Sequence, residues 1–198
     1  MSSIVYELGN NLYINLTNRC PCACKFCVRN DKDGVGSADS LWLDAEPSAE
    51  QVIAELKLRD LSNYGSVVFC GFGEPLCAFD VLLETAKWLK LNGAKVRINT
   101  NGLGDLINGK PTAPPLSGLI DAVSISLNAP DAKRYNELCR PEFGETSFDA
   151  MLKFASDCRQ YVPEVTLTIV DTIPQSEIDE CKSVAANADV PLRIRNFI

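Results

Sequence analysis

Four cysteines within eight residues constrain this chain of 198 residues more than any other feature. They are Cys20, Cys22, Cys24 and Cys27, and three of them, Cys20, Cys24 and Cys27, have the spacing C-x3-C-x2-C. Phe26 stands directly before the last. A compact loop with this spacing can turn three thiolates toward one small object. We therefore interpret these cysteines as metal ligands rather than as a disulfide framework.

Two kinds of metal centre are compatible with this loop. A structural zinc site is normally closed by four ligands, whereas three cysteines on an iron–sulfur cluster leave one iron open. Zinc would need Cys22 as its fourth ligand, because the chain contains no histidine. All four ligands would then be crowded together instead of forming two separated pairs. The spacing favours an iron–sulfur cluster, with zinc as the alternative.

The composition is that of a globular protein. Hydrophobic residues make up 46% and charged residues 23% of the chain, which are ordinary values. The length fits one domain that covers residues 1–198. No apolar run is long enough to cross a bilayer, and the N-terminal residues lack the basic and apolar segments of a signal peptide. Nine cysteines without an export signal predict a protein of the reducing cytoplasm.

The charge distribution bears on possible partners. A net charge of −7 argues against a general affinity for nucleic acid. Near the cysteines the balance is reversed by Arg19, Lys25, Arg29 and Lys32. These cations are either the solvated charges of a loop or a docking patch for an acidic electron donor or an anionic substrate.

Apolar runs and helical periodicity alternate along the chain. We expect six strands, at residues 11–17, 66–70, 95–99, 122–127, 165–170 and 191–197, with helices between them and a long loop at 31–47. Such alternation predicts parallel strands joined by right-handed crossovers. A closed eight-unit barrel needs about 250 residues, so the predicted fold is an α/β protein with a partial (β/α)6 barrel. A flat doubly wound sheet is the alternative.

The unusual motifs all follow predicted strands, and parallel α/β folds bind ligands at the carboxyl ends of their strands. The cysteine loop follows the first strand. The other candidate positions are Gly71, Gly73 and Glu74 after the second strand, Thr100 and Asn101 after the third, and Ser124, Ser126 and Asn128 on or just past the fourth. This shared placement predicts one binding pocket.

Each motif also has a plainer interpretation. Gly71 and Gly73 let backbone approach a ligand closely, and Glu74 can accept a hydrogen bond from an ammonium group, but the same residues suit a simple strand–helix turn. Asn101 and the glycine after it equally suit an ordinary turn. Serines at alternate strand positions share one face, yet they could be buried groups bonded to backbone.

The cysteine motif with Phe26 resembles the signature of the radical S-adenosylmethionine (radical SAM) enzymes. Gly71-Phe72-Gly73-Glu74 resembles that family's Gly-Gly-Glu motif, with Phe72 where a glycine is usual. The resemblance implies the same partial (β/α)6 barrel. It also implies a [4Fe–4S] cluster held by three cysteines, with SAM chelating the fourth iron through its amino and carboxylate groups.

The resemblance further implies roles for individual positions. Cys20, Cys24 and Cys27 would ligate iron, and Gly73 with Glu74 would orient the methionine amine. Phe26 would pack near the adenine. The remaining positions that would contact SAM or substrate are Gly71, Thr100, Asn101, Ser124, Ser126 and Asn128, with Thr166, Thr168 and Val170 near the adenine. No catalytic residue can be singled out.

The implied activity is reductive cleavage of SAM to a 5′-deoxyadenosyl radical that abstracts hydrogen from an unidentified substrate, small or large. It would require an external electron donor of the flavodoxin or ferredoxin type. The chain looks similar to small stand-alone members, including the group associated with TatD-type nucleases, organic-radical activating enzymes and 7-carboxy-7-deazaguanine synthases. The alternatives are a non-catalytic iron–sulfur electron carrier or sensor and a zinc-stabilised binding module.

The other cysteines are less informative. Cys70 and Cys77 flank the glycine motif and could lie near a cluster. Cys139, Cys158 and Cys181 fall in or near predicted helices and are most simply small apolar core residues. Cys22 is expected to be a thiol without a metal.

Overall fold

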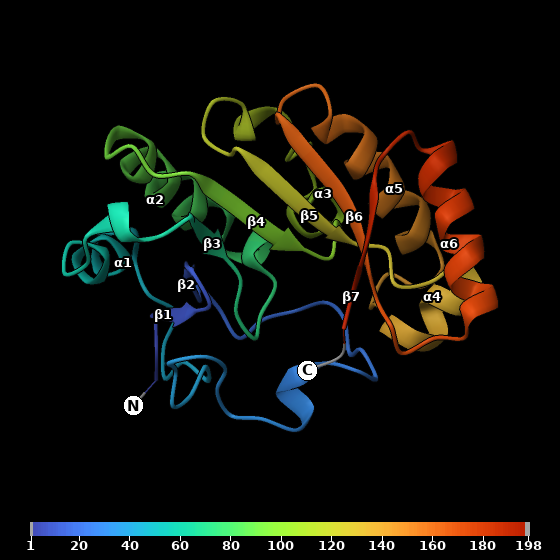
Figure 1. Ribbon diagram of the computed structural model, residues 1–198, viewed down its shortest axis with the longest axis horizontal. Helices are drawn as coiled ribbons and strands as arrows, with labels where there is room; N and C mark the ends of the chain where they lie inside the picture. The colour runs from blue at the N-terminus through green and yellow to red at the C-terminus, as the bar shows by residue number, and fades with distance from the viewer. Residues whose placement is uncertain (1, 197–198) are drawn as a thin grey trace.

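The computed structural model describes residues 2–196 and shows a curved sheet of seven strands with helices on its outer face (Figure 1). The strands are β1 (Val5–Leu8), β2 (Asn11–Ile14), β3 (Ser66–Phe69), β4 (Val96–Thr100), β5 (Ala122–Ser126), β6 (Glu164–Val170) and β7 (Leu192–Arg195). Their order in the sheet is their order in the chain. Each connection therefore moves one strand further in the same direction.

Strands β2 to β7 are parallel to their neighbours, and only β1 pairs antiparallel, with β2. The sheet begins at β1 and ends at β7 without closing on itself. A doubly wound sheet would reverse its strand order at a switch point, and no reversal occurs. The prediction of a partial (β/α)6 barrel is confirmed, and the flat-sheet alternative is wrong.

The first strand of the sheet was not predicted. β1 and β2 form a hairpin whose two-residue turn contains Gly9 at a φ of +58°, a left-handed conformation that glycine adopts easily. The strand expected at residues 11–17 ends at Ile14, so the chain leaves the sheet before the cysteines. β7 runs from Leu192 to Arg195, so it begins and ends within the strand expected at 191–197, of which residue 197 lies outside the described residues.

Six α-helices connect the strands. They are α1 (Ala49–Leu56), α2 (Phe79–Leu91), α3 (Gly104–Asn108), α4 (Ala132–Cys139), α5 (Thr146–Cys158) and α6 (Gln175–Asn187). α1 begins with a capping box in which Ser48 and Gln51 exchange hydrogen bonds, an arrangement that satisfies free backbone amides at a helix start. α3 is a short helix between β4 and β5. Within the described residues no helix could span a membrane.

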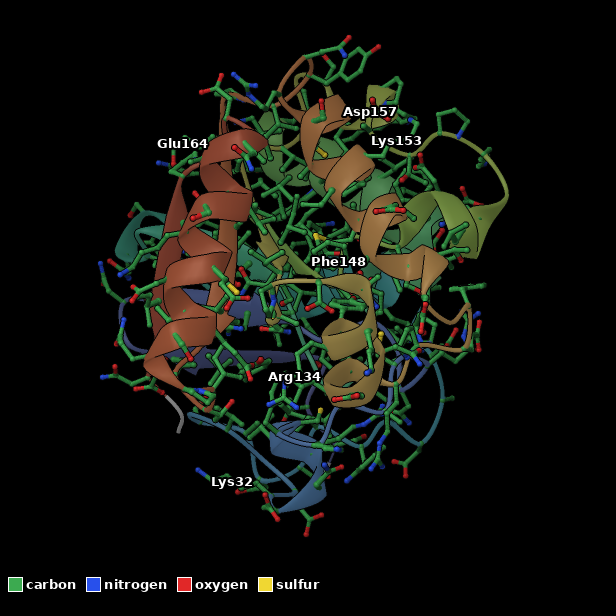
Figure 2. All side chains as sticks on the ribbon, turned by 90° about the vertical axis from the view of Figure 1, so that its right-hand side faces the viewer. Lys32, Arg134, Phe148, Lys153, Asp157 and Glu164 are labelled. Carbon is green, nitrogen blue, oxygen red and sulfur yellow. The ribbon has the colours of Figure 1, made fainter. Side chains whose placement is uncertain are left out.

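The helices pack on the convex side of the sheet. Alternate strand residues such as Ile98, Ile125 and Leu167 face this layer and are fully buried. Figure 2 looks onto α4, α5 and α6, and Arg134 on α4 pairs with Glu177 on α6 at 2.9 Å. The main core therefore lies outside the barrel and leaves its inner face for other groups.

A second, smaller apolar cluster lies on the concave side. Its buried members are Tyr6, Tyr13, Ala38, Leu41, Val68 and Phe72. They join strands β1 to β3 to the long loop at residues 31–47, which passes under the sheet in Figure 1. The loop thus covers the concave face at the N-terminal half of the barrel only.

Candidate functional site

A cavity of about 420 Å³ opens at the carboxyl ends of the strands. Its walls come from the cysteine loop, the glycine motif after β3 and the ends of β4 to β7. The predicted site residues that line it are Cys20, Cys24, Phe26, Cys27, Gly71, Gly73, Glu74, Thr100, Asn101, Ser126, Asn128 and Val170. The structure does not bring Ser124, Thr166 or Thr168 to this wall.

The cysteine loop is fixed against the end of α4. The amide of Ala23 donates to the Cys139 carbonyl and the amide of Lys25 donates to the Leu138 carbonyl, each at 3.0 Å. The last carbonyls of a helix have no hydrogen-bond donors within the helix, so the amides of the cysteine loop act as their donors. This contact explains how four closely spaced cysteines keep a defined course without regular secondary structure.

Five cysteine thiols besides Cys27 face the cavity, namely those of Cys20, Cys22, Cys24, Cys70 and Cys139. Hydrogen bonds from Cys139 and from Cys22 lower the pKa of Cys24 to about 4, and a hydrogen bond from Cys22 lowers the pKa of Cys20. Thiolates are the form that binds metal. The loop therefore favours the ligand form at two of its three motif cysteines.

The remaining thiols have different environments. Burial is the main cause that raises the pKa of Cys27, whereas the hydrogen bond to Cys20 is the first cause that raises the pKa of Cys22. Cys139 lies in the core, as predicted, but it also lines the cavity. The sequence carried no signal for that second position, because Cys139 is far from the motif in the chain.

The sulfurs are not gathered around one point. Among residues 2–196, no three Cys, Asp or Glu side chains are arranged to hold a single metal ion. In a [4Fe–4S] cluster each cysteine binds a different iron, so its ligands must face a shared space. The motif cysteines do face such a space.

Glu74 connects the glycine motif to the end of β4. Its Oε1 accepts hydrogen bonds from the Thr100 hydroxyl at 2.7 Å and the Leu76 amide at 3.1 Å, and its Oε2 accepts one from the Asn101 amide at 2.7 Å. Burial nevertheless raises its pKa to about 7. A carboxylate has about four acceptor positions, two on each oxygen. Both positions of Oε1 are occupied, and one position of Oε2 remains for a further donor at the cavity wall.

Both glycines of the motif are required by the chain that crosses them. A Cβ at Gly73 would lie 2.2 Å from the Thr17 carbonyl oxygen, and one at Gly71 would lie 2.0 Å from the Asn15 side-chain oxygen. These are impossible contacts. The close approach that the sequence predicted is therefore made by the segment leading into the cysteine loop.

The phenylalanine of the motif has a packing role. Phe72 is buried, and its ring meets Trp42 edge-on with centroids 5.1 Å apart. Trp42 belongs to the 31–47 loop. A glycine at this position could not hold that loop, which gives a physical reason for the departure from Gly-Gly-Glu.

Amide side chains complete the walls of the cavity. The amide nitrogen of Asn101 lies 3.7 Å from the sulfur of Cys22, and that of Asn128 lies 3.8 Å from the sulfur of Cys139. The Oδ1 atoms of Asn99 and Asn128 are buried without a hydrogen-bond partner in the described structure. Buried orphan acceptors at a cavity wall indicate that a ligand supplies donors there.

The cation patch near the cysteines is smaller than predicted. Arg19 forms a two-pronged ion pair with Glu46, at 2.7 and 2.8 Å, and it also donates to the Cys77 carbonyl at 2.8 Å. Lys25 and Lys32 are exposed, and Lys32 stands at the outer end of the loop in Figure 2. Arg29 is partly buried and donates to the Cys22 carbonyl at 3.0 Å, so any docking role falls to the two lysines.

The fold and the site together define an α/β protein whose partial barrel carries a cysteine-lined cavity at the strand ends. Residues 14–183 match the Radical SAM superfamily. The chain therefore belongs to this family, as the cysteine motif predicted. Enzymes of the family use a [4Fe–4S] cluster and SAM, and they need a reductant.

Two curated relatives illustrate the sequence similarity. A GTP 3′,8-cyclase of Corynebacterium glutamicum (strain R) is 32% identical over 139 residues, which are 68% of this chain and 35% of the cyclase. A protein of Synechococcus sp. (strain CC9902) named "Probable dual-specificity RNA methyltransferase RlmN" is 28% identical over 155 residues, or 72% of this chain and 40% of that protein. The chain thus spans less than half the length of either relative.

Solved structures show the same fold. The structure of anSMEcpe with bound AdoMet superposes with a TM-score of 0.66 at 20% identity, covering 94% of this chain and 51% of that one. Methylornithine synthase (PylB) gives a TM-score of 0.61 at 15% identity, covering 95% and 53%. At these identities the likeness establishes the architecture alone.

The residues present fit the cofactors of the family. The wall offers three motif thiols, a free acceptor position on Glu74 and the orphan oxygen of Asn128. The cavity volume lies within the range of small-molecule sites. Acceptors for an amine and soft sulfur ligands for iron therefore occupy one cavity.

Proposed function

We propose that this protein is a radical SAM enzyme in which Cys20, Cys24 and Cys27 hold a [4Fe–4S] cluster and the adjoining cavity holds SAM. The observation that carries this proposal is the shared cavity, which brings the motif thiols and the Glu74 carboxylate together from separate strand ends. When bound and reduced, the cluster supplies the electron for reductive cleavage of SAM, and hydrogen is then abstracted from a substrate.

The chain's own residues would bind and orient SAM. The free position on Glu74 Oε2 would accept a hydrogen bond from the methionine ammonium, and Thr100 and the Asn101 amide hold that carboxylate in place. Phe26, in the cysteine loop, would pack against the adenine. Ser126 and Asn128 would provide polar contacts from the end of β5.

The surroundings of the cluster support its reduction by an external donor. The cysteine loop lies at the rim of the barrel, and the exposed Lys25 and Lys32 give it local positive charge. We propose that an acidic carrier of the flavodoxin or ferredoxin type docks there. All nine cysteines are free thiols, so we place the protein in a reducing compartment, the cytoplasm.

Anaerobic reconstitution tests the assignment. We expect about four irons and four sulfides per chain, and dithionite-dependent release of 5′-deoxyadenosine from SAM. The Cys24→Ala variant should lose both. Cys158→Ala is the matched control, because Cys158 is buried on α5 outside the cavity, and Cys22→Ala should keep the cluster.

Each of the other outcomes would indicate a different class of protein or a different set of ligands. A redox-active cluster that leaves SAM intact would identify an electron carrier or sensor. Stoichiometric zinc without iron would identify a zinc-stabilised binding module. Retention of cluster and cleavage in Cys24→Ala would contradict the ligand assignment itself.

A further inference from the structure

The concave face of the sheet has two halves of opposite character. The half formed by β1 to β3 is covered by the apolar cluster of the 31–47 loop. The half formed by β4 to β7 presents polar side chains at alternate positions, namely Arg97, Asn99, Ser124, Ser126, Thr166, Thr168, Arg193 and Arg195. Three arginines thus face one space in a protein whose net charge is −7.

Two of these arginines contact hydroxyl groups of other strands. The Nη2 of Arg97 lies 3.4 Å from the Tyr13 hydroxyl, to which it donates, and the Nη2 of Arg193 donates to the Ser124 hydroxyl at 3.3 Å. Burial raises the pKa of Tyr13, and the charges of Arg97 and Arg193 both oppose that rise. Arg97 of β4 thus contacts the Tyr13 hydroxyl directly, and the charge of Arg193 on β7 also acts on that hydroxyl.

Within residues 2–196 no salt bridge joins any of the three arginines to a carboxylate. The Nε of Arg97 is buried without a hydrogen-bond partner. Loss of solvent is the main cause that lowers the pKa of Arg195, and the nearby charge of Arg193 lowers it further, whereas the Cys70 thiol raises it. Like charges held close together repel one another, and an anion that joins them relieves this repulsion.

Arg195 connects this group to the proposed reaction site. It lines the cavity together with Asn99, Ser126 and Val170, on the wall that the carboxyl ends of β4 to β7 provide. More than a third of its surface remains exposed, because β7 is the last strand of an open sheet. This guanidinium therefore lines the same cavity as the motif cysteines and is also open to solvent.

We propose that Arg97, Arg193 and Arg195 form a binding site for an oxyanion group, a carboxylate or a phosphate, carried by the substrate. The planar fork of arginine matches both groups with paired hydrogen bonds. The inference deepens the proposed function and rests on it, since the anion would hold the rest of the substrate against the SAM cavity.

Binding of sulfate tests the site without knowledge of the substrate. Equilibrium dialysis of radiolabelled sulfate against the reconstituted protein should show one saturable site at low ionic strength. Arg97→Gln and Arg195→Gln should each weaken it about tenfold, which corresponds to about 1.4 kcal/mol. The matched control is Lys87→Gln, which removes the same charge from the exposed face of α2 and should leave binding unchanged.

A second experiment tests whether the arginines bind an anion of the substrate or the carboxylate of SAM. SAM added at saturation should leave sulfate binding unchanged, and Arg97→Gln, at a residue outside the cavity wall, should leave SAM binding and cluster content unchanged. Displacement of sulfate by SAM, or loss of SAM affinity in Arg97→Gln, would assign the arginines to the cofactor and overturn the proposal.

The remaining outcomes are also decisive. Absence of saturable sulfate binding, or equal binding by the wild type and both glutamine variants, would overturn the proposal. Circular dichroism checks folding, and Arg195→Lys, which keeps the charge but loses the fork, should bind with intermediate affinity. Failure of the proposed function would appear separately, as absence of cluster or of 5′-deoxyadenosine release.

Discussion

Titration of Glu74 should make the stability of the cluster-free protein depend on pH. Burial raises the pKa of this carboxyl from its ordinary value of 4.5 to about 7, and the hydrogen bonds from Asn101, Thr100 and Leu76 offset that rise only in part. Each tenfold change in proton affinity corresponds to about 1.4 kcal/mol, so a rise of this size corresponds to about 3 kcal/mol.

The direction of this pH dependence follows from which state, folded or unfolded, binds the Glu74 proton more tightly. Between pH 4.5 and 7 the folded protein retains the proton on Glu74 while the unfolded chain releases it. The free energy of unfolding should therefore be highest below pH 4.5 and should fall by about 3 kcal/mol as the pH rises through 7. Glu74→Gln cannot ionise and should lack this fall.

Urea unfolding, monitored by tryptophan fluorescence in reducing buffer between pH 4.5 and 8, measures the difference between the two proteins. Other titrating groups cancel in the comparison. Glu84→Gln, which removes an exposed carboxylate from α2, should keep the fall. Equal pH slopes in the wild type and Glu74→Gln would refute the argument, because they would mean that Glu74 is not desolvated.

Two further predictions concern the glycine motif. Gly73→Ala should lower the free energy of unfolding by about 1–3 kcal/mol, because the new Cβ meets the carbonyl oxygens of Thr17 and Arg19; urea unfolding checks this, and unchanged stability would contradict the close crossing. Phe72→Ala should lower it by about 3–5 kcal/mol and shift the fluorescence of Trp42, and an unchanged emission spectrum would show that the 31–47 loop does not depend on this contact.

Much of the fold followed from local patterns. Buried strands such as β3 read as continuous apolar runs, and the helices between them showed their apolar spacing, so the parallel alternation could be predicted. β1 was missed because a four-residue strand in a hairpin carries little periodicity. The end of β2 at Ile14 could not be predicted from the sequence either. Residues 15–17 stay buried after the strand has ended, as strand residues are.

The candidate site could be predicted in part. The cysteine spacing and the placement of Glu74 and Asn101 after strands indicated which groups would meet. The positions of Cys139 and Arg195 on the cavity wall could not be foreseen, because neither belongs to a motif and both arrive from distant parts of the chain. Their contribution depends on how the ends of α4 and β7 meet the cysteine loop and the strand ends.

The sequence by itself determined the chemistry that this protein carries, because thiol spacing and strand-end polarity are properties of short segments. Only the tertiary structure decided how Glu74 is used and where the arginines gather. The curvature of the sheet brings β4 and β7 around one interior. Burial raises the pKa of the Glu74 carboxyl, and Arg97 and Arg193 contact hydroxyl groups rather than carboxylates. Desolvation and long-range charge depend on the surroundings of a residue, which no local pattern encodes.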